Sequence, residues 1–316
     1  MTVRVGALLW PQTDGWPAIS DAAVRADKAG LDSLWTWDHL MAIVGPWQQP
    51  ILEGWTTLAA MAVLTESATL GLMVGANTFR NPALTVKLAT TLDHMSNGRA
   101  ILGIGGAWFE REHEAFGIEF GSGFGDRLTW LDEAAELIRD MLRDGTATAR
   151  GPRYQAASVR NDPPPIQPRL PILIGGDGEK KTLATVARYA DMWNTGGDLE
   201  FVRHKDEVLR RWCERVGRDE SEIERTLGLG LLIIRDDPAE ARRVDAAIRE
   251  HHPGYSEAPR IGTAEQIAES LVPYVGLGFR HIFYDVAAPY DEETLERFVG
   301  EVKPMLEAGS TAAARR

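Results

Sequence analysis

Short apolar segments rich in β-formers alternate with amphipathic helical segments from one end of the chain to the other. The expected strands span residues 3–9, 32–37, 68–74, 99–104, 172–174, 191–193, 227–234 and 281–284. The expected helices span residues 17–29, 55–65, 83–95, 126–142, 180–189, 200–216, 264–275 and 292–306. Eight strand–helix units in strict alternation favour an α/β fold of the closed (β/α)8 TIM barrel type. The order alone leaves an open doubly wound sheet as an alternative.

Three stretches interrupt the alternation, and we expect them to be insertions after strand four (105–125), before strand five (145–171) and after strand seven (235–262). The first and third follow strands, where barrel insertions often form a pocket wall or a lid. The alternative for each is surface decoration. We expect a single domain over residues 1–306, because no shift in composition divides the chain. Residues 307–316 are small and polar, and we expect them to fray.

Composition excludes several classes of function. The net charge of −12 argues against nucleic-acid binding, which requires a basic surface. Cys213 is the only cysteine, so no internal disulfide can form and a reducing compartment is expected. The apolar runs are too short to span a bilayer, and the N-terminus leads into a strand without a signal-peptide pattern. We therefore expect a cytoplasmic protein with no membrane partner.

The C-terminal strand ends, where barrel enzymes hold their chemistry, carry few acid–base groups. Strand two ends in Trp37-Asp38-His39, and His39 is the candidate for proton exchange, with Asp38 beside it. Trp37 and Trp47 are expected to line a pocket suited to a planar ring, and His113 can also face it. The alternative is that these side chains are structural. No His, Cys, Asp or Glu group has metal-ligand spacing, so no metal is expected.

The turn after strand five is a second candidate. Its sequence, IGGDGEKKT, places glycines and free backbone N–H groups at the start of a helix. A helix N-terminus attracts anions, and Thr182 adds a hydroxyl group. The turn is neither a Walker loop nor a GxGxxG motif. It is consistent with a phosphate cradle, and equally with an ordinary tight turn.

Four segments in order carry a family resemblance: WDHL, LGLMVGANTFRNP, TLDHMSNGRAILGIGGAWFEREHEAFG and PILIGGDGEKKTLATVARYADMWN. Together they resemble the luciferase-like monooxygenase superfamily, and within it the branch that uses coenzyme F420, an 8-hydroxy-5-deazaflavin. The resemblance extends over residues 3–306. It implies a barrel enzyme that acts on a small-molecule substrate and forms a homodimer.

The resemblance also assigns roles to individual residues. It implies that the Met73–Val74 peptide bond is cis and forms a bulge behind the central ring of the cofactor. It places Asp38 and His39 beside the reactive carbon, where the histidine handles the substrate proton. The implied cofactor contacts are Met73, Val74, Gly75, Asn77, Ala107, Trp108, Gly175, Gly176, Gly178, Glu179, Thr182, Trp193 and Asn194.

One position departs from the family pattern. Gly106 occupies the place of a glutamate in the deazaflavin-dependent sugar-phosphate dehydrogenases, and of a flavin-phosphate arginine in bacterial luciferase. This departure puts sugar-phosphate oxidation and the luciferase mode of FMN binding in doubt.

The function expected from the sequence is an F420-dependent oxidoreductase that moves a hydride between deazaflavin C5 and a small organic substrate, with His39 as general acid or base. One alternative is an FMN-dependent monooxygenase that uses O2 and reduced flavin from a partner flavin reductase. The other is a non-catalytic flavin-binding barrel.

Overall fold

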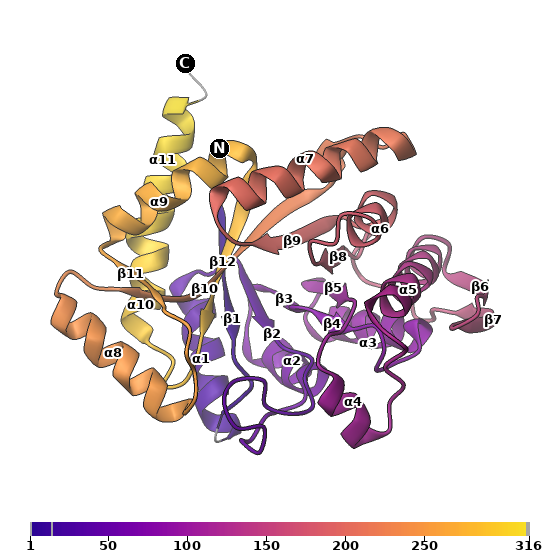
Figure 1. Cartoon of the computed structure of the whole chain (residues 1–316), viewed down its shortest axis with the longest axis horizontal. Helices are drawn as coiled ribbons and strands as arrows, with labels where there is room; N and C mark the ends of the chain where they lie inside the picture. The colour runs from indigo at the N-terminus through magenta and orange to yellow at the C-terminus, as the bar shows by residue number, and fades with distance from the viewer. Residues whose placement is uncertain (1, 14, 314–316) are drawn as a thin grey trace. The chain divides into compact units, whose positions relative to one another are not determined.

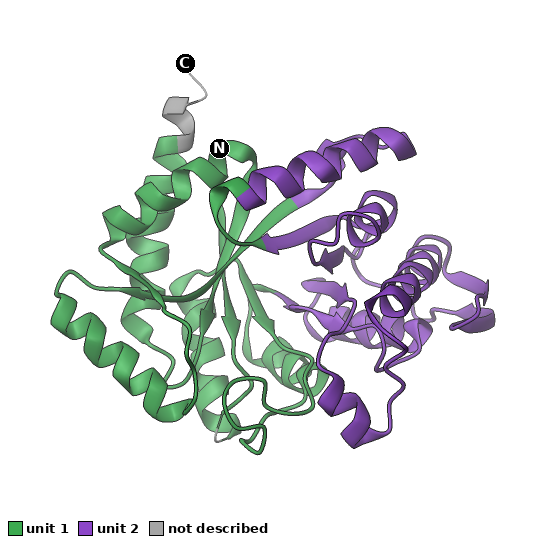
Figure 2. Ribbon diagram, in the orientation of Figure 1, with its two compact units in different colours: residues 1–69, 196–200, 225–316 green, residues 70–195, 201–224 purple. Residues whose placement is uncertain are grey.

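The computed structural model describes residues 2–13 and 15–313. The chain divides into two compact units, which Figure 2 distinguishes by colour. Unit 1 comprises Met1–Thr69, Gly196–Glu200 and Arg225–Arg316, and unit 2 comprises Leu70–Thr195 and Phe201–Glu224. The single-domain expectation stays a prediction.

Unit 1 contains parallel strands and the helices that connect them (Figure 1). Its elements are β1 (Arg4–Leu9), α1 (Trp16–Ala29), β2 (Ser33–Thr36), α2 (Gly54–Leu64), β10 (Glu224–Ile234), α8 (Pro238–His251), β11 (Arg260–Gly262), α9 (Ala264–Leu277), β12 (Phe279–Val286), α10 (Glu292–Arg297), a π-helical turn (Phe298–Val302) and α11 (Lys303–Ala313). Its strands pair in the order β11-β10-β12-β1-β2, all parallel. Helices α9 and α11 pack against each other.

Unit 2 also contains parallel strands that alternate with helices. Its elements are β3 (Thr69–Leu72, beginning at the unit boundary), β4 (Gly75–Ala76), α3 (Pro82–Met95), β5 (Ala100–Gly105), α4 (Glu110–Phe116), α5 (Phe124–Asp144), β6 (Thr146–Arg150), β7 (Gln155–Arg160), β8 (Ile172–Gly175), α6 (Thr182–Tyr189), β9 (Met192–Gly196), α7 (Leu199–Val216) and a short 3-10 helix (Glu220–Glu222). The parallel order is β3-β5-β8-β9, and β4 also pairs with β5. Helix α5 packs against α3 and α6.

The helix ends follow from local chemistry. Gly30 ends α1 with φ 93°, a left-handed conformation that costs glycine little. Asn81 caps α3 by accepting a hydrogen bond from the Ala83 N–H, and Pro82 occupies the first turn. Thr263 begins α9 with a reciprocal capping box. These three boundaries lie within one residue of those predicted from the sequence.

The three predicted insertions contain structure that the sequence did not predict. Helix α4 lies after strand four, the antiparallel β6–β7 hairpin lies before strand five, and α8 with β11 follows strand seven. Helix α11 continues to Ala313, so residues 307–313 are helical, and the expected fraying of the tail stays a prediction. Residues 314–316 lie outside the described part of the chain. None of the described helices has the length and apolar composition needed to cross a bilayer.

Close packing on one face of β1, β2 and β12 depends on a glycine. Gly6 lies opposite Ser33 and Phe283 in register, and a Cβ atom there would lie 2.1 Å from Ser33 Oγ. Ser33 Oγ contacts His281 Nε2 at 2.7 Å and accepts a hydrogen bond from Trp35 Nε1 at 2.9 Å. Large rings therefore fill this face because one position has no side chain.

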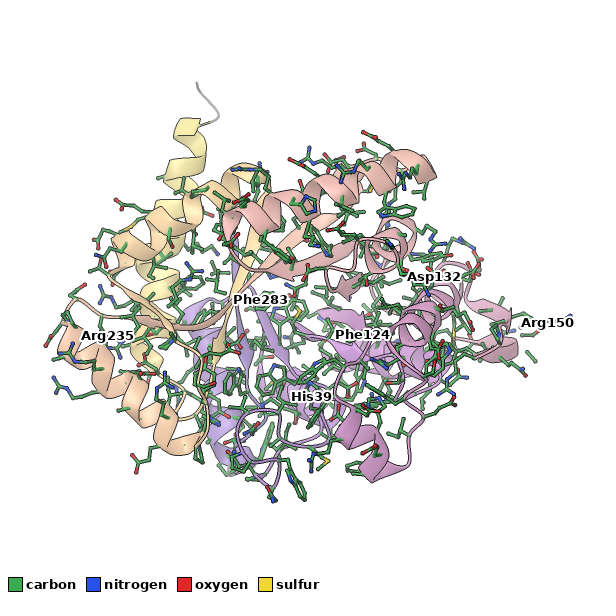
Figure 3. The ribbon with its side chains drawn as sticks, in the orientation of Figure 1. His39, Phe124, Asp132, Arg150, Arg235 and Phe283 are labelled. Carbon is green, nitrogen blue, oxygen red and sulfur yellow. The ribbon has the colours of Figure 1, made fainter. Side chains whose placement is uncertain are left out.

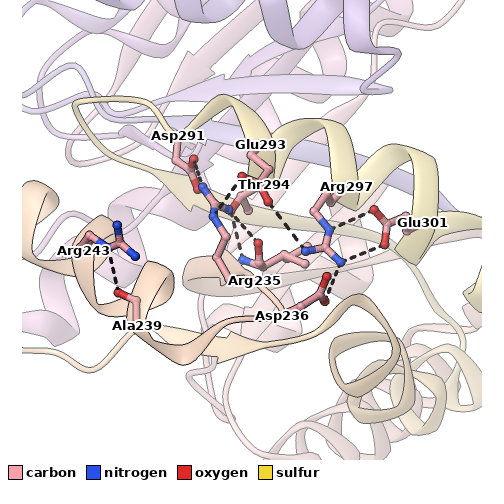
Figure 4. A network of polar contacts seen from close by, with 10 residues as sticks. Arg235, Asp236, Ala239, Arg243, Asp291, Glu293, Thr294, Arg297 and Glu301 are labelled. Carbon is pink, nitrogen blue, oxygen red and sulfur yellow. Dashed lines mark hydrogen bonds and ion pairs between the residues drawn. The ribbon is translucent and has the colours of Figure 1, made fainter.

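A charged network in unit 1 connects the end of β10 to α10 (Figure 4). Arg235 directly follows β10, is 8% exposed, and lies 2.6 Å from Asp291 and 3.2 Å from Glu293. Arg297 lies 2.9 Å from Asp236 and 2.9 Å from Glu301. The guanidinium of Arg235 is therefore held by ion pairs within unit 1, although its position directly after a strand would also suit a ligand-binding residue.

Replacing Arg235 by methionine should lower the free energy of unfolding by about 3 kcal/mol, because a poorly solvated Asp291 carboxylate would lose its partner. Denaturant unfolding measures this loss. Arg243 is the matched control, since it is exposed on α8 and its Nε donates to the Ala239 carbonyl at 3.4 Å, with no ion pair among the described residues. An Arg235→Met variant as stable as Arg243→Met would contradict the assignment.

Candidate active site

The floor of the candidate site in unit 2 is built around Val74. The Met73–Val74 peptide bond is cis, which confirms the prediction, and β4 then resumes pairing with β5. The Val74 side chain lies against two glycines. A Cβ atom at Gly105 would be 2.6 Å from Val74 Cγ2, and one at Gly175 would be 3.0 Å from Val74 Cγ1. These glycines therefore make room for Val74, a packing reason that the sequence did not reveal.

The turn between β8 and α6 has the features of an anion cradle. Within the described residues, the backbone N–H groups of Asp177 and Gly178 have no hydrogen-bond partner. Gly176 has φ 121°, a conformation that L side chains rarely adopt. A Cβ atom at Gly178 would lie 2.6 Å from Thr182 Oγ1, at the first residue of α6. The turn therefore presents two N–H donors at a helix N-terminus, where a phosphate group binds well, and the Thr182 side chain beside Gly178 is only 4% exposed.

Two acidic residues of this turn are engaged with the protein. Asp177 Oδ1 accepts a hydrogen bond from Thr195 Oγ1 at 2.5 Å, and burial raises the pKa of its carboxyl. The Glu179 carboxylate lies 2.7 Å from Lys205 and 2.9 Å from His204 on α7, and the hydrogen bond from Lys205 lowers its pKa. The Glu179 side chain is therefore held by α7, which leaves its backbone to contribute to the turn.

Two residues predicted to contact the cofactor are buried and form hydrogen bonds within the protein. Asn77 is 3% exposed, and its amide fits best when it donates to the Gly105 carbonyl at 2.9 Å and accepts from the Leu131 N–H at 3.0 Å. Trp193 is fully buried and donates from Nε1 to the Gly176 carbonyl at 3.0 Å. Both side chains hold the loops of the site in place. Their polar groups are therefore used within the protein, and neighbouring residues are better placed to contact a ligand.

His113, expected to face the pocket, is fully buried. Its Nε2 lies 2.7 Å from Thr78 Oγ1 and its Nδ1 lies 2.8 Å from the Phe109 carbonyl oxygen. Its ring packs against Phe79 and Phe120, with centroid distances of 4.9 and 4.6 Å. Both ring nitrogens are engaged, so His113 fixes α4 to the segment after β4.

Other predicted contacts in unit 2 stay accessible. Ala107 has a positive φ of 55°, and its carbonyl accepts from Arg127 Nε at 3.3 Å. The adjacent Trp108 side chain is 55% exposed. Asn194 is partly exposed, and its carbonyl accepts from the Gly176 N–H at 3.2 Å. These residues border the same strand ends as the Val74 floor.

In unit 1, the predicted acid–base pair follows β2. His39 (labelled in Figure 3) is partly exposed, whereas Asp38 is 2% exposed. The edge of the His39 ring meets the Trp37 ring, with centroids 6.4 Å apart and an interplanar angle of 80°. Trp37 in turn packs on Trp10 at 4.8 Å, and Trp47 is 44% exposed. An accessible imidazole beside aromatic rings can exchange a proton with a bound molecule.

Sequence reasoning missed Asp285. The predicted strand ended at Tyr284, but β12 continues to Val286. Trp10 Nε1 donates to Asp285 Oδ2 at 3.1 Å, and burial, with a smaller contribution from Glu257, raises the pKa of Asp285 to about 7. The two-residue alternation from Phe283 to Asp285 is the sequence pattern that could have revealed it.

The described residues contain no group of three or more His, Cys, Asp or Glu side chains arranged to hold a metal ion.

Comparison with known proteins places this chain. The family model described as luciferase-like monooxygenase matches residues 2–260. The F420-dependent glucose-6-phosphate dehydrogenase of Amycolatopsis mediterranei (strain U-32) is 26% identical, over 97% of this chain and 99% of that protein.

Two solved structures share the fold. An F420-dependent secondary alcohol dehydrogenase in complex with an F420-acetone adduct has a TM-score of 0.79 at 19% identity, covering 97% of this chain and 99% of that one. A riboflavin lyase with modified FMN and its substrate riboflavin has a TM-score of 0.79 at 16% identity, covering 98% and 92%. These likenesses confirm the predicted fold, a closed eight-stranded parallel (β/α)8 barrel with surrounding helices. Because the family model matches most of its length, the chain belongs to the luciferase-like monooxygenase family of oxidoreductases.

Proposed function

We propose that this protein is an F420-dependent oxidoreductase that transfers a hydride between deazaflavin C5 and a small organic substrate. One observation carries the proposal. A relative named as F420-dependent matches 97% of the chain, and the strand-end positions that the family uses hold an anion cradle and an accessible imidazole here. By resemblance to the family we also propose a homodimer. Cys213 as the only cysteine supports a reducing compartment such as the cytoplasm.

The residues of unit 2 fit such a cofactor. The N–H groups of Asp177 and Gly178, with the Thr182 hydroxyl, would hold its phosphate at the start of α6. When bound, F420 supplies or accepts the hydride at C5. The bulge at Val74 would support the ring, bordered by Gly75, Ala107, Trp108 and Asn194.

His39 would exchange the proton that accompanies hydride transfer, and Asp38 would orient the imidazole. In (β/α)8-barrel enzymes, catalytic residues come from the ends of several different strands, and His39 directly follows such a strand end. Trp37, Trp47 and Trp108 would exclude water and keep the substrate aligned. Holding the reactants in alignment is a large part of catalysis in such reactions.

The second candidate is an FMN-dependent monooxygenase, which the riboflavin lyase with modified FMN favours. It would use O2 and reduced flavin from a partner reductase. The end of strand four argues against the luciferase mode of phosphate binding. Gly106 lacks the arginine, and even a Cβ atom there would lie 2.8 Å from Leu128 Cδ2. A non-catalytic flavin-binding role is the weakest candidate, because His39 is accessible and beside Asp38.

Cofactor choice is tested by titrating the purified protein with F420 and with FMN. We expect F420 to bind at least about ten-fold more tightly, a difference of about 1.4 kcal/mol. Quenching of cofactor fluorescence measures both affinities. Tight binding of FMN with no measurable affinity for F420 would reverse the ranking.

Gly178→Ala should weaken F420 binding about ten-fold or more, because the new Cβ would displace Thr182 Oγ1 from a distance of 2.6 Å. Gly125→Ala is the matched control, since a Cβ at Gly125 would meet no atom within 4 Å. Cofactor titration and a thermal melt separate a binding defect from instability. Unchanged affinity in Gly178→Ala would place the phosphate elsewhere.

His39→Ala should keep its cofactor and lose about 10²–10⁴-fold in turnover, the usual contribution of a general acid–base group. The melting temperature should change little, since His39 lies in a loop. His94→Ala is the control, because that ring is exposed and, within the described part of the chain, its one polar contact is with the Pro164 carbonyl, at 2.8 Å. Near wild-type turnover would make His39 structural, and loss of cofactor would make it part of the binding floor.

A further inference from the structure

One carboxyl group in unit 1 has no role in the mechanism proposed above. Asp285 is opposite Leu8 in the register of β1 and β12, and it shares a face of β12 with Phe283. It lies at the C-terminal end of its strand, where barrel enzymes place substrate-binding residues. Oδ2 accepts the Trp10 Nε1 hydrogen bond at 3.1 Å, whereas Oδ1 has no hydrogen-bond partner within the described part of the chain.

The surroundings of this carboxyl are aromatic. The Trp10 ring packs on Trp37 at 4.8 Å, on His252 at 5.1 Å and on Tyr255 at 5.6 Å. Among the described residues, no lysine or arginine forms an ion pair with Asp285. Asp285 is only partly exposed as a residue, and burial is the largest influence on its carboxyl.

The charged groups nearby do not neutralise it. Glu257 opposes its ionisation, which adds to the effect of burial in raising the pKa of Asp285 to about 7. Arg249 is committed to other partners: it lies 3.0 Å from Asp245 and donates to the carbonyls of Tyr255 and Glu257 at 2.7 and 3.0 Å. Other titratable groups on neighbouring segments include Tyr255, His252, Asp38, His39 and Arg235, and burial raises the pKa of Tyr255 to about 12.

We propose that the Asp285 carboxyl hydrogen-bonds the oxygen of an uncharged, apolar ketone or alcohol, and that this wall of the site disfavours anionic substrates. The substrate class rests on the proposed hydride-transfer function. A protonated carboxyl donates to a ketone oxygen, and a carboxylate accepts from an alcohol. Indole and phenol rings cover the apolar part of such a molecule. A phosphorylated sugar would meet two acidic side chains here, Asp285 and Glu257, neither of which forms an ion pair with a lysine or arginine among the described residues.

Two probes test the proposal: acetophenone, which is uncharged, and 4-acetylbenzoate, which is the same ketone with a carboxylate group added to the ring. Calorimetric titration of the full chain, with and without F420, should show acetophenone binding at least about ten-fold more tightly than 4-acetylbenzoate. Acetophenone affinity should fall about ten-fold from pH 6 to pH 8, because the carboxyl is protonated below its pKa and loses the donated proton above it.

Two variants at position 285 test whether the Asp285 carboxyl causes this pH dependence. Asp285→Asn keeps a donor that does not titrate, so acetophenone affinity should become independent of pH. Asp285→Leu should bind acetophenone weakly at both pH values, and thermal melts check that both variants fold. Asp21→Asn is the control, since Asp21 is exposed on α1, and it should keep the wild-type profile.

The outcomes separate this proposal from the proposed function. Loss of F420 binding with the acetophenone results intact would refute only the cofactor assignment. Three results would overturn the role of Asp285: no binding of acetophenone, equal binding of 4-acetylbenzoate, or an Asp285→Asn variant that retains the pH dependence.

Discussion

The contact of Val74 with Gly105 and Gly175 is the constraint on which the unit 2 site depends. Val74 projects from the break between β3 and β4, and it meets β5 and β8 where each strand ends. Any side chain at Gly105 would displace it, because a Cβ there would lie 2.6 Å away. Close-packed interiors transmit such a displacement to their neighbours. The position of the floor, and of the cradle that begins at Gly176, therefore depends on the absence of a side chain at Gly105 and at Gly175.

The sequence predicted the order of strands and helices better than it predicted the structure of the insertions and the exact strand ends. Alternating strands and amphipathic helices are recorded in local periodicity, so the order of the eight strand–helix units was predicted and most bounds lie within about three residues of those observed. The closing helix is the exception, since it is interrupted by a π-helical turn and continues to Ala313. Helix α8 and the β6–β7 hairpin were missed, since they lie in stretches where periodicity is weak or the composition indicates a loop. Asp285 was missed because β12 continues two residues past Tyr284, and strand ends carry little local information.

The candidate site was predicted only in part, for a different physical reason. A polar residue at a strand end can bind a ligand or bind the protein, and its partner is distant in sequence. Thr78 engages His113, and Asp291 engages Arg235, whereas the Asp285 carboxyl has no cationic partner among the described residues. From the sequence, His113 was expected to face the pocket, and neither Arg235 nor Asp285 was recognised as a candidate. The cis bond at Met73–Val74 was predicted because a whole motif carried it.

The hydrogen bond from Trp10 to Asp285 also gives the protein an optical property. Indole emission depends on the electric field across the ring, and Trp10 donates its Nε1 hydrogen directly to a carboxyl whose pKa is about 7. The charge beside this one ring changes near neutral pH, and it changes again whenever a bound molecule shifts the carboxyl between its protonated and ionised forms. Among the ten tryptophans of the chain, Trp10 is thus a built-in fluorescent reporter of the ionisation of Asp285.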